Sequence, residues 1–196
     1  MPIHFAAPPA NGTSLVQAGL KKLSTRTSPL SGRGVDFNAL ELSPPHAVYD
    51  LRADAVAAGG GLASATQTGF RYLVTGGGVN VAAAEVHADA NRTATLLANI
   101  NYGQFVEASA RALTQVAALP AVGAASFEVR LLRFSAIALM SLWLKPDSGT
   151  GDIIYPLAPA PPGLQAGQSY SAANFMSAIL PLVQRRVEKK DPAAVP

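Results

Sequence analysis

The chain has 196 residues, no cysteine and a formal net charge of +3, and only 14% of its residues are charged, against roughly 25% in ordinary domains. Without cysteine it can form no disulfide, thiolate metal site, iron–sulfur cluster or cysteine nucleophile. Hydrophobic residues make up 49% of the chain, which argues against wholesale disorder, and the length suits one domain with a sizeable core.

Residues 1–46 are expected to form an extended N-terminal arm, because proline, glycine, serine and threonine recur throughout the segment. A short helix is predicted inside it, over 14–23. No acidic residue precedes Asp36. The cations in the same stretch are Lys21, Lys22, Arg26 and Arg33. The arm is expected to lie on a neighbouring surface or to be solvated; a transit peptide and a nucleic-acid contact are the alternatives.

The compact domain is predicted over 47–188, and it begins with a short helix or turn between His46 and Ala58. A hairpin follows. The segment 70–75 is rich in strand formers, 76–78 is a glycine triplet that can take positive φ, and 79–88 forms the returning strand.

The middle of the domain is predicted to continue with a strand over 95–100 and then a helix over 104–119. Apolar residues recur at helical spacing in the second segment, and Pro120 follows directly after it. The strand and the helix are joined by Asn101, Tyr102 and Gly103.

Residues 127–145 are predicted to form the central strand of the core. Apolar and charged residues alternate at first, and the run then becomes apolar on both faces. Nineteen residues would make an overlong strand, so a bend or bulge is expected near 133–135. After a turn over 145–151, residues 152–157 are expected to pair back.

A last helix is predicted to run to about Val187, with Ser169 or Ser171 as its N-cap. Pro181 lies inside this pattern and should kink or split the helix. Residues 189–196 are expected to form a flexible tail. The fold class that follows is α+β: a mainly antiparallel sheet with helices packed on it, in a single domain with an extended N-terminal arm.

The most apolar run, Phe134–Leu144, is shorter than the about 20 residues that a membrane helix needs. No charged segment followed by an apolar one opens the chain, so a secretory signal is not expected. These features predict a cytoplasmic protein without a membrane span.

The sequence contains no P-loop, HExxH, GxSxG or SxxK motif. The glycine triplets 59–61 and 76–78 lack the strand–GxGxxG–helix context of a dinucleotide site and are interpreted as loop and hairpin glycines. No cofactor or metal is therefore predicted. The missing motifs favour a non-enzymatic protein, although an enzyme with an unfamiliar site would lack them too.

The strongest candidate for a ligand site is the trio Glu85, His87 and Asp89. In a regular strand these residues point to one face, with about 7 Å between successive side chains. The two carboxylates would then raise the pKa of the imidazole or, with it, supply mixed N and O ligands to a divalent metal. The competing interpretation is a strand that leaves the core there and shows a polar, solvated face.

A second candidate ligand site is the predicted strand-to-helix junction, where Asn99, Asn101 and Tyr102 lie close in sequence. Junctions of this kind hold ligands in some α/β folds, but asparagine is also an ordinary turn residue. The predicted strands carry three arginines, which are expected to pair with Glu85, Glu107 or Glu128, to face water or to bind an anion. These arginines are Arg71, Arg130 and Arg133.

Low charge density and the missing motifs favour a non-enzymatic structural or interaction subunit of a larger assembly, as a homo-oligomer or with a protein partner. A codon bias toward alanine, glycine and proline would also lower the charge density. The first alternative is a small-molecule-binding protein or enzyme that uses Glu85, His87 and Asp89. A nucleic-acid contact through the basic arm and the segment 185–190 is the less favoured alternative.

Overall fold

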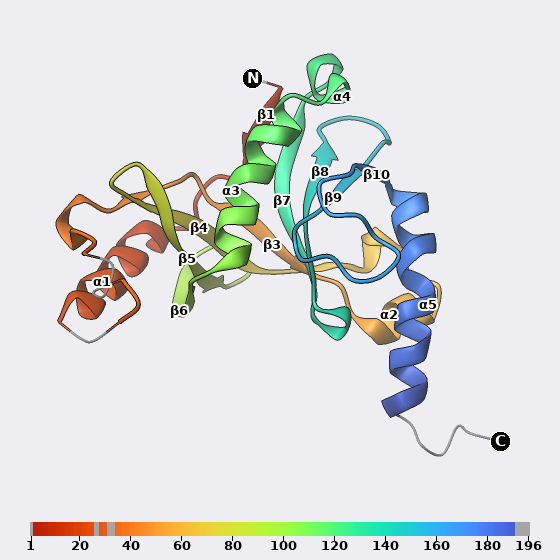
Figure 1. Ribbon diagram of the computed structural model, residues 1–196, viewed down its shortest axis with the longest axis horizontal. Helices are drawn as coiled ribbons and strands as arrows, with labels where there is room; N and C mark the ends of the chain where they lie inside the picture. The colour runs from red at the N-terminus through yellow and green to blue at the C-terminus, as the bar shows by residue number, and fades with distance from the viewer. Residues whose placement is uncertain (1, 26–27, 31–33, 191–196) are drawn as a thin grey trace.

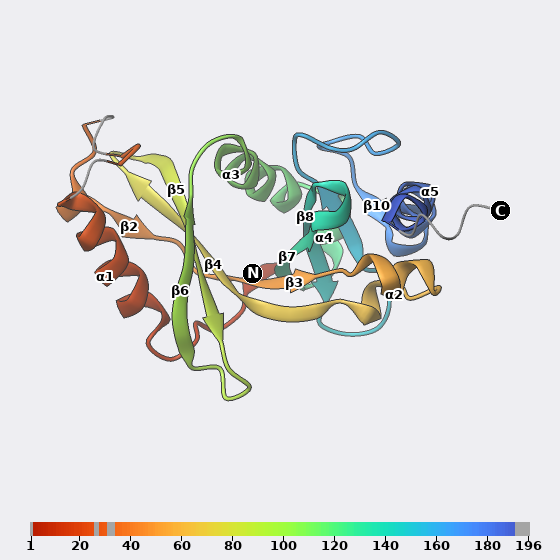
Figure 2. The same cartoon turned by 90° about the horizontal axis from the view of Figure 1, so that it is seen from below.

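The computed structural model describes residues 2–25, 28–30 and 34–190, with side chains as far as Val187. Within these residues the chain forms a ten-stranded sheet with α-helices on both faces (Figures 1 and 2). The strands are β1 (Ile3–Phe5), β2 (Glu41–Leu42), β3 (His46–Asp50), β4 (Thr66–Gly76), β5 (Val79–Ala88), β6 (Ala94–Asn101), β7 (Phe127–Phe134), β8 (Leu139–Pro146), β9 (Ile153–Pro156) and β10 (Tyr170–Ser171). The helices are α1 (Gly12–Ser24), α2 (Ala53–Ala57), α3 (Gln104–Ala117), α4 (Pro120–Ala124) and α5 (Ala172–Lys190), with 3₁₀ turns η2 (Phe37–Ala39), η3 (Leu62–Ser64) and η4 (Ser135–Ile137).

The strand order across the sheet is β10-β9-β8-β7-β3-β4-β5-β6, with β1 also paired to β7 and β2 to β4. Among these pairs, β3–β7 and β1–β7 are parallel and the others are antiparallel. The predicted α+β class with a mainly antiparallel sheet is confirmed. Strand β3 joins the two halves of the sheet, because it pairs with β4 on one side and with β7 on the other.

The helices cover the sheet in two layers. Phe70 and Tyr72 of β4 pack in one core cluster with α1, and Leu132 of β7 packs in another with α5. Leu131, the neighbour of Leu132, packs with α3. Since successive strand residues face opposite sides, α3 lies on one face and α1 and α5 lie on the other, near the two ends of the sheet (Figure 2).

The first predicted hairpin is present as β4–β5, and its turn consists of Gly77 and Gly78 with φ of 60° and 79°. Positive φ at both turn positions is the conformation that glycine adopts without steric cost. The predicted strand over 95–100 is β6, and the predicted helix over 104–119 is α3. The segment after His46 differs from the prediction, because residues 46–50 form a strand and only 53–57 are helical.

The long strand predicted over 127–145 is two strands. A 3₁₀ turn at Ser135–Ile137 reverses the chain, so that β7 and β8 form an antiparallel hairpin. Ala138 takes the left-handed conformation at the end of this turn, with φ of 52°. The returning segment predicted over 152–157 is present as β9, which pairs with β8.

The last helix, α5, begins after Ser171, whose Oγ accepts a hydrogen bond from the backbone N–H of Asn174 at 3.2 Å. One of the two predicted N-cap residues is thereby confirmed. The helix is continuous through Pro181. None of the helices in the described part of the chain is both long and apolar enough to cross a membrane.

Much of the segment expected as an extended arm packs on the sheet. The helix expected over 14–23 is α1, and Val16, Leu20 and Leu30 are buried in the core beside β4 and β5. Hydrophobic burial of these leucine and valine side chains holds the segment in place. Arg26 and Arg33 of the predicted basic arm lie outside the described residues, as does the predicted tail from residue 191 onward.

Candidate functional site

Strand β6 ends the sheet, and most of its outer edge is open. Among the described residues, Ala10 alone bridges to that edge, at Thr93. Its N–H donates to the carbonyl of Arg92 and its carbonyl accepts from the N–H of Ala94, both at 2.8 Å. From residue 95 to 101, no described strand pairs with the outer side of β6.

The composition of β6 is unusual for an exposed edge. In natural sheets, charged residues, proline, short strands or bulges keep edge strands from pairing with other chains. The opposite edge strand, β10, is only two residues long, whereas β6 has eight residues and contains neither a charge nor a proline. Leu96 is 57% exposed on it. An exposed, uncharged edge of this length can pair with a strand from another chain.

Two register shifts against β5 determine where the side chains of β6 point. They leave Thr95 and Ala98 as extra residues in the edge strand. Because Ala98 is an extra residue, Leu97 and Ile100 both pack on the α1 side although they are three residues apart. Leu97 occupies the space beside Gly19. Bulges also twist a strand edge, so a docking strand meets short regular stretches rather than one long template.

A row of polar residues crosses four strands and ends at this edge. His46 of β3, Arg71 of β4, Glu85 of β5 and Asn99 of β6 are direct partners in the strand register. Arg71 Nη1 donates to Glu85 Oε1 at 3.2 Å. The row lies on the same face of the sheet as α3, because Arg71 alternates with Phe70 and Tyr72 of the α1 side.

Arg133 of β7 connects this row to a second carboxylate. Its Nη1 donates to Glu85 Oε2 at 2.9 Å, and its Nε and Nη2 donate to the two carboxylate oxygens of Asp50 at 2.6 and 3.0 Å. The bidentate pair raises the pKa of Arg133, chiefly through the hydrogen bonds that its guanidinium donates to Asp50. Two cations and two anions therefore neutralise one another within this network.

The network is buried at its centre. Arg71 is only 2% exposed, and burial lowers its pKa although Glu85 opposes that shift. Its Nη1 also contacts Met140 Sδ at 3.3 Å, while its Nε and Nη2 have no hydrogen-bond partner among the described residues. Removing one partner from such a pair leaves an uncompensated buried charge. The network thus links β3, β4, β5 and β7, and its member Glu85 lies on β5, the strand next to the edge strand β6.

The structure does not bring Glu85, His87 and Asp89 together as a ligand set. Glu85 is engaged by the two arginines, and exposed His87 donates from Nδ1 to the carbonyl of Thr68 at 2.9 Å. Asp89 accepts hydrogen bonds from backbone N–H groups of its own loop, at 3.0 and 2.9 Å. Across the described part of the chain, no group of three or more His, Asp or Glu side chains could hold a metal ion.

The second predicted set divides between the two faces. Asn99 Nδ2 donates to Asn101 Oδ1 at 2.9 Å, so these two amides lie side by side on β6. Tyr102 instead packs against the core cluster beneath α1, and burial raises the pKa of its hydroxyl. Of the expected arginine pairs, Arg71 and Arg133 bind Glu85, and Arg130 donates to Glu128 at 2.6 Å. Glu107 takes part in none of them.

His46, at the inner end of the row, is buried against the ring of Phe5. Its Nδ1 donates to the carbonyl of Arg71 at 3.3 Å, and its Nε2 has no partner among the described residues. Burial lowers the pKa of His46 from 6.5 to about 4, and the nearby Arg71 charge adds to that shift. The folded protein therefore holds this imidazole neutral.

The free energy of unfolding is expected to fall by up to about 3 kcal/mol as the pH is lowered from 6.5 to about 4. In that interval the unfolded chain binds a proton at His46 that the folded chain does not bind. Urea unfolding at pH 7 and pH 4.5 would measure this loss. His46→Gln should lose much less stability on acidification than the wild type, whereas the exposed His87→Gln should behave like the wild type. If all three proteins lose the same free energy of unfolding between pH 7 and pH 4.5, His46 is not the source of the pH dependence.

No known protein family, curated protein or solved structure matches the chain. The open edge was not singled out in the sequence, although a signal for it exists. The segment 94–101 has no charge, proline or glycine, a composition typical of strands that pair readily with other strands.

Proposed function

We propose that the protein is a non-enzymatic structural subunit that assembles with further copies of itself through the edge of β6. The observation that carries this proposal is the eight-residue edge strand, uncharged and open beyond Ala94, with Leu96 exposed on it. Pairing would satisfy backbone N–H and C=O groups and would cover the leucine.

A second copy is the partner that this edge suits best. In a two-fold pair each residue meets the same strand of the other copy, and like charges at opposed positions would repel. Strand β6 has no charged residue to cause such repulsion. The side-chain amides of Asn99 and Asn101 both donate and accept hydrogen bonds, so they are self-complementary.

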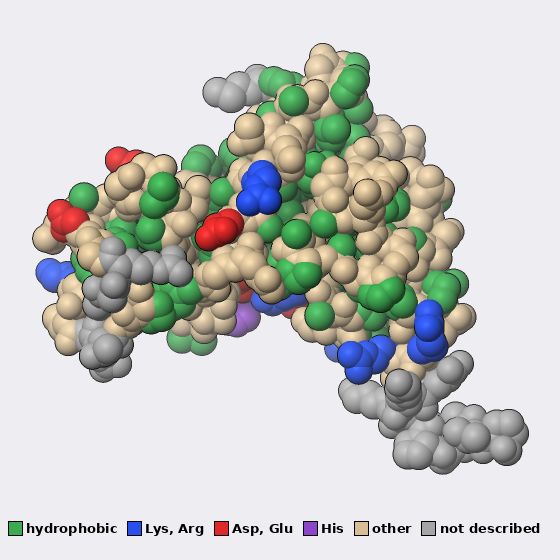
Figure 3. Space-filling view, in the orientation of Figure 1, with side chains coloured by type: hydrophobic (Ala, Val, Ile, Leu, Met, Phe, Trp, Pro, Cys, Tyr) green, Lys and Arg blue, Asp and Glu red, His purple; other side chains and the backbone are tan. Residues whose placement is uncertain are grey.

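The general character of the surface agrees with this proposal. On the face drawn in the space-filling view, charged side chains are sparse and are separated by wide areas of other atoms (Figure 3). Only 14% of the residues are charged, which offers little electrostatic repulsion between copies. Because bulges shorten the regular stretches of β6, the pairing should be of moderate strength, with a dissociation constant on the order of 1–100 μM.

Leu96→Lys is expected to weaken self-association by about tenfold or more, because it places a charge on the edge of each copy. Sedimentation velocity of the full chain over a concentration series from about 1 to 200 μM would measure the dissociation constant. Val187→Lys is the matched control: Val187 is 38% exposed on α5, at the other end of the sheet, and gains the same charge. The control should associate like the wild type.

Two outcomes would overturn the proposal. The first is a wild-type protein that stays monomeric at the highest concentration. The second is association that Leu96→Lys and Val187→Lys weaken equally, because that result would place the interface elsewhere. Equal thermal unfolding temperatures of the three proteins would show that Leu96→Lys acts on assembly and not on folding.

A further inference from the structure

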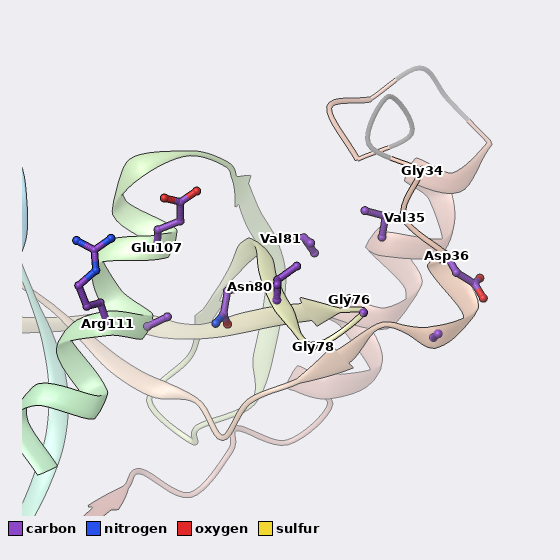
Figure 4. Close-up of a pocket in the computed structure, with 13 residues that line it drawn as sticks. Gly34, Val35, Asp36, Gly76, Gly78, Asn80, Val81, Glu107 and Arg111 are labelled. Atoms are coloured by element: carbon purple, nitrogen blue, oxygen red, sulfur yellow. The ribbon is translucent and has the colours of Figure 1, made fainter.

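A hollow of about 810 Å³ lies between the β4–β5 turn, the segment around η2 and helix α3 (Figure 4). Its volume falls within the roughly 300–1,000 Å³ that is typical of small-molecule sites. Val35, before η2, and Val81, on β5, give it an apolar part, and Glu107 and Arg111 lie along the wall that α3 forms. The hollow is thus apolar on one side and charged on the other.

Glu107 and Arg111 are the unusual feature of this wall. They lie four residues apart on α3 with the acidic residue first, the arrangement that favours an ion pair along a helix. No such pair forms between them, and neither side chain has an ion pair or a hydrogen bond to any other described residue. Figure 4 shows both side chains projecting from α3 on the same side of the helix.

The other polar groups at the hollow are partly engaged. Asp36 caps η2 by accepting a hydrogen bond from the N–H of Asn38 at 2.9 Å, and its carboxylate points away from α3 (Figure 4). Asn80 Oδ1 accepts from the hydroxyl of Thr75 at 3.5 Å, which leaves the amide nitrogen of Asn80 as a donor. The hollow therefore presents one free carboxylate and one free guanidinium beside an apolar surface.

We propose that this hollow binds a small zwitterion, namely an α-amino acid with an apolar side chain. The ammonium group would bind Glu107 and the carboxylate would bind Arg111, whose planar fork suits a carboxylate. The apolar side chain would lie against Val35 and Val81. A purely anionic or cationic ligand would leave one of the two protein charges unpaired. This site is separate from the edge of β6 and does not depend on self-association.

The test is calorimetric titration of the full-length protein with three compounds: leucine, leucinamide without the carboxylate, and N-acetylleucine without the ammonium. Leucine is expected to bind saturably, and each derivative about tenfold more weakly or worse, because a charge-assisted contact is lost. Arg111→Gln should abolish the preference for leucine over leucinamide, and Glu107→Gln the preference over N-acetylleucine. Arg185→Gln, at an exposed arginine of α5, should leave all three affinities unchanged.

The variants separate binding from folding, since both side chains are exposed and have no partner to lose. Their thermal unfolding should match that of the wild type. The proposal would be overturned by a wild-type protein that binds no leucine, isoleucine, valine or phenylalanine at millimolar concentration. Saturable binding that Glu107→Gln and Arg111→Gln leave unchanged would overturn it as well.

Discussion

Replacing Glu85 with alanine is expected to lower the free energy of unfolding by about 3–5 kcal/mol, because it breaks a buried ion network by removing its shared anion. Arg71 would lose its carboxylate partner, and Arg133 would lose one of two. Arg133 keeps its bidentate contact with Asp50, but Arg71 would keep only the contact with the Met140 sulfur. Urea unfolding at pH 7, followed by far-UV circular dichroism, measures the loss.

Glu128→Ala is the matched control for this prediction. Glu128 also pairs with an arginine on the sheet, Arg130. The side chains of both partners are partly open to solvent, so removing the Glu128 carboxylate should cost about 1 kcal/mol or less. The double variant Arg71→Leu/Glu85→Leu removes the orphaned charge together with its partner and should recover most of the lost stability. The prediction is wrong if Glu85→Ala and Glu128→Ala destabilise the protein equally.

Replacing Phe175 with alanine is expected to lower the free energy of unfolding by about 3–5 kcal/mol, because the change leaves a cavity between α5 and the sheet. Phe175 is fully buried and packs with Trp143 and Ile154 in the core cluster under α5. The loss should show as a lower midpoint of urea unfolding with an unchanged slope, since the surface exposed on unfolding stays nearly the same.

Met176→Ala, one residue further along α5, provides the comparison. Its side chain is only partly buried against the same cluster, so its truncation should cost clearly less than that of Phe175. If the two variants lose equal stability, Phe175 does not anchor α5 to the sheet in the way that its burial indicates. If the slope falls strongly in Phe175→Ala, the helix detaches before the rest of the domain unfolds.

Local patterns in the sequence predict several elements of this fold correctly. The β4–β5 hairpin follows from strand formers around a glycine triplet, and α3 follows from apolar residues at helical spacing before Pro120. Each of these signals lies within about 20 consecutive residues, so no distant contact is needed to interpret it. The same local basis explains the correct prediction of Ser171 as a cap of α5.

Other elements were predicted wrongly because their local signals are weak. The turn between β7 and β8 contains no glycine or proline, and strand-forming residues continue on both sides of it, so the hairpin resembles one long strand. The expected arm is rich in turn residues, yet Val16, Leu20 and Leu30 bury against β4 and β5, which begin 36 or more residues later in the sequence. Only contacts with those strands decide that the segment packs.

In the candidate sites, too, local sequence patterns predict some features, and contacts between distant strands decide the others. The sequence predicts that the strand arginines pair with Glu85, Glu107 or Glu128, but not that Arg71 of β4 and Arg133 of β7 both bind Glu85. The row from His46 to Asn99 exists only because four strands meet in one register, and the open edge exists only because β6 comes last in the strand order. Residue types and their periodicity specify which side chains are available. Pairing between distant strands, which burial of the whole core stabilises, decides which of them meet and which face is left uncovered.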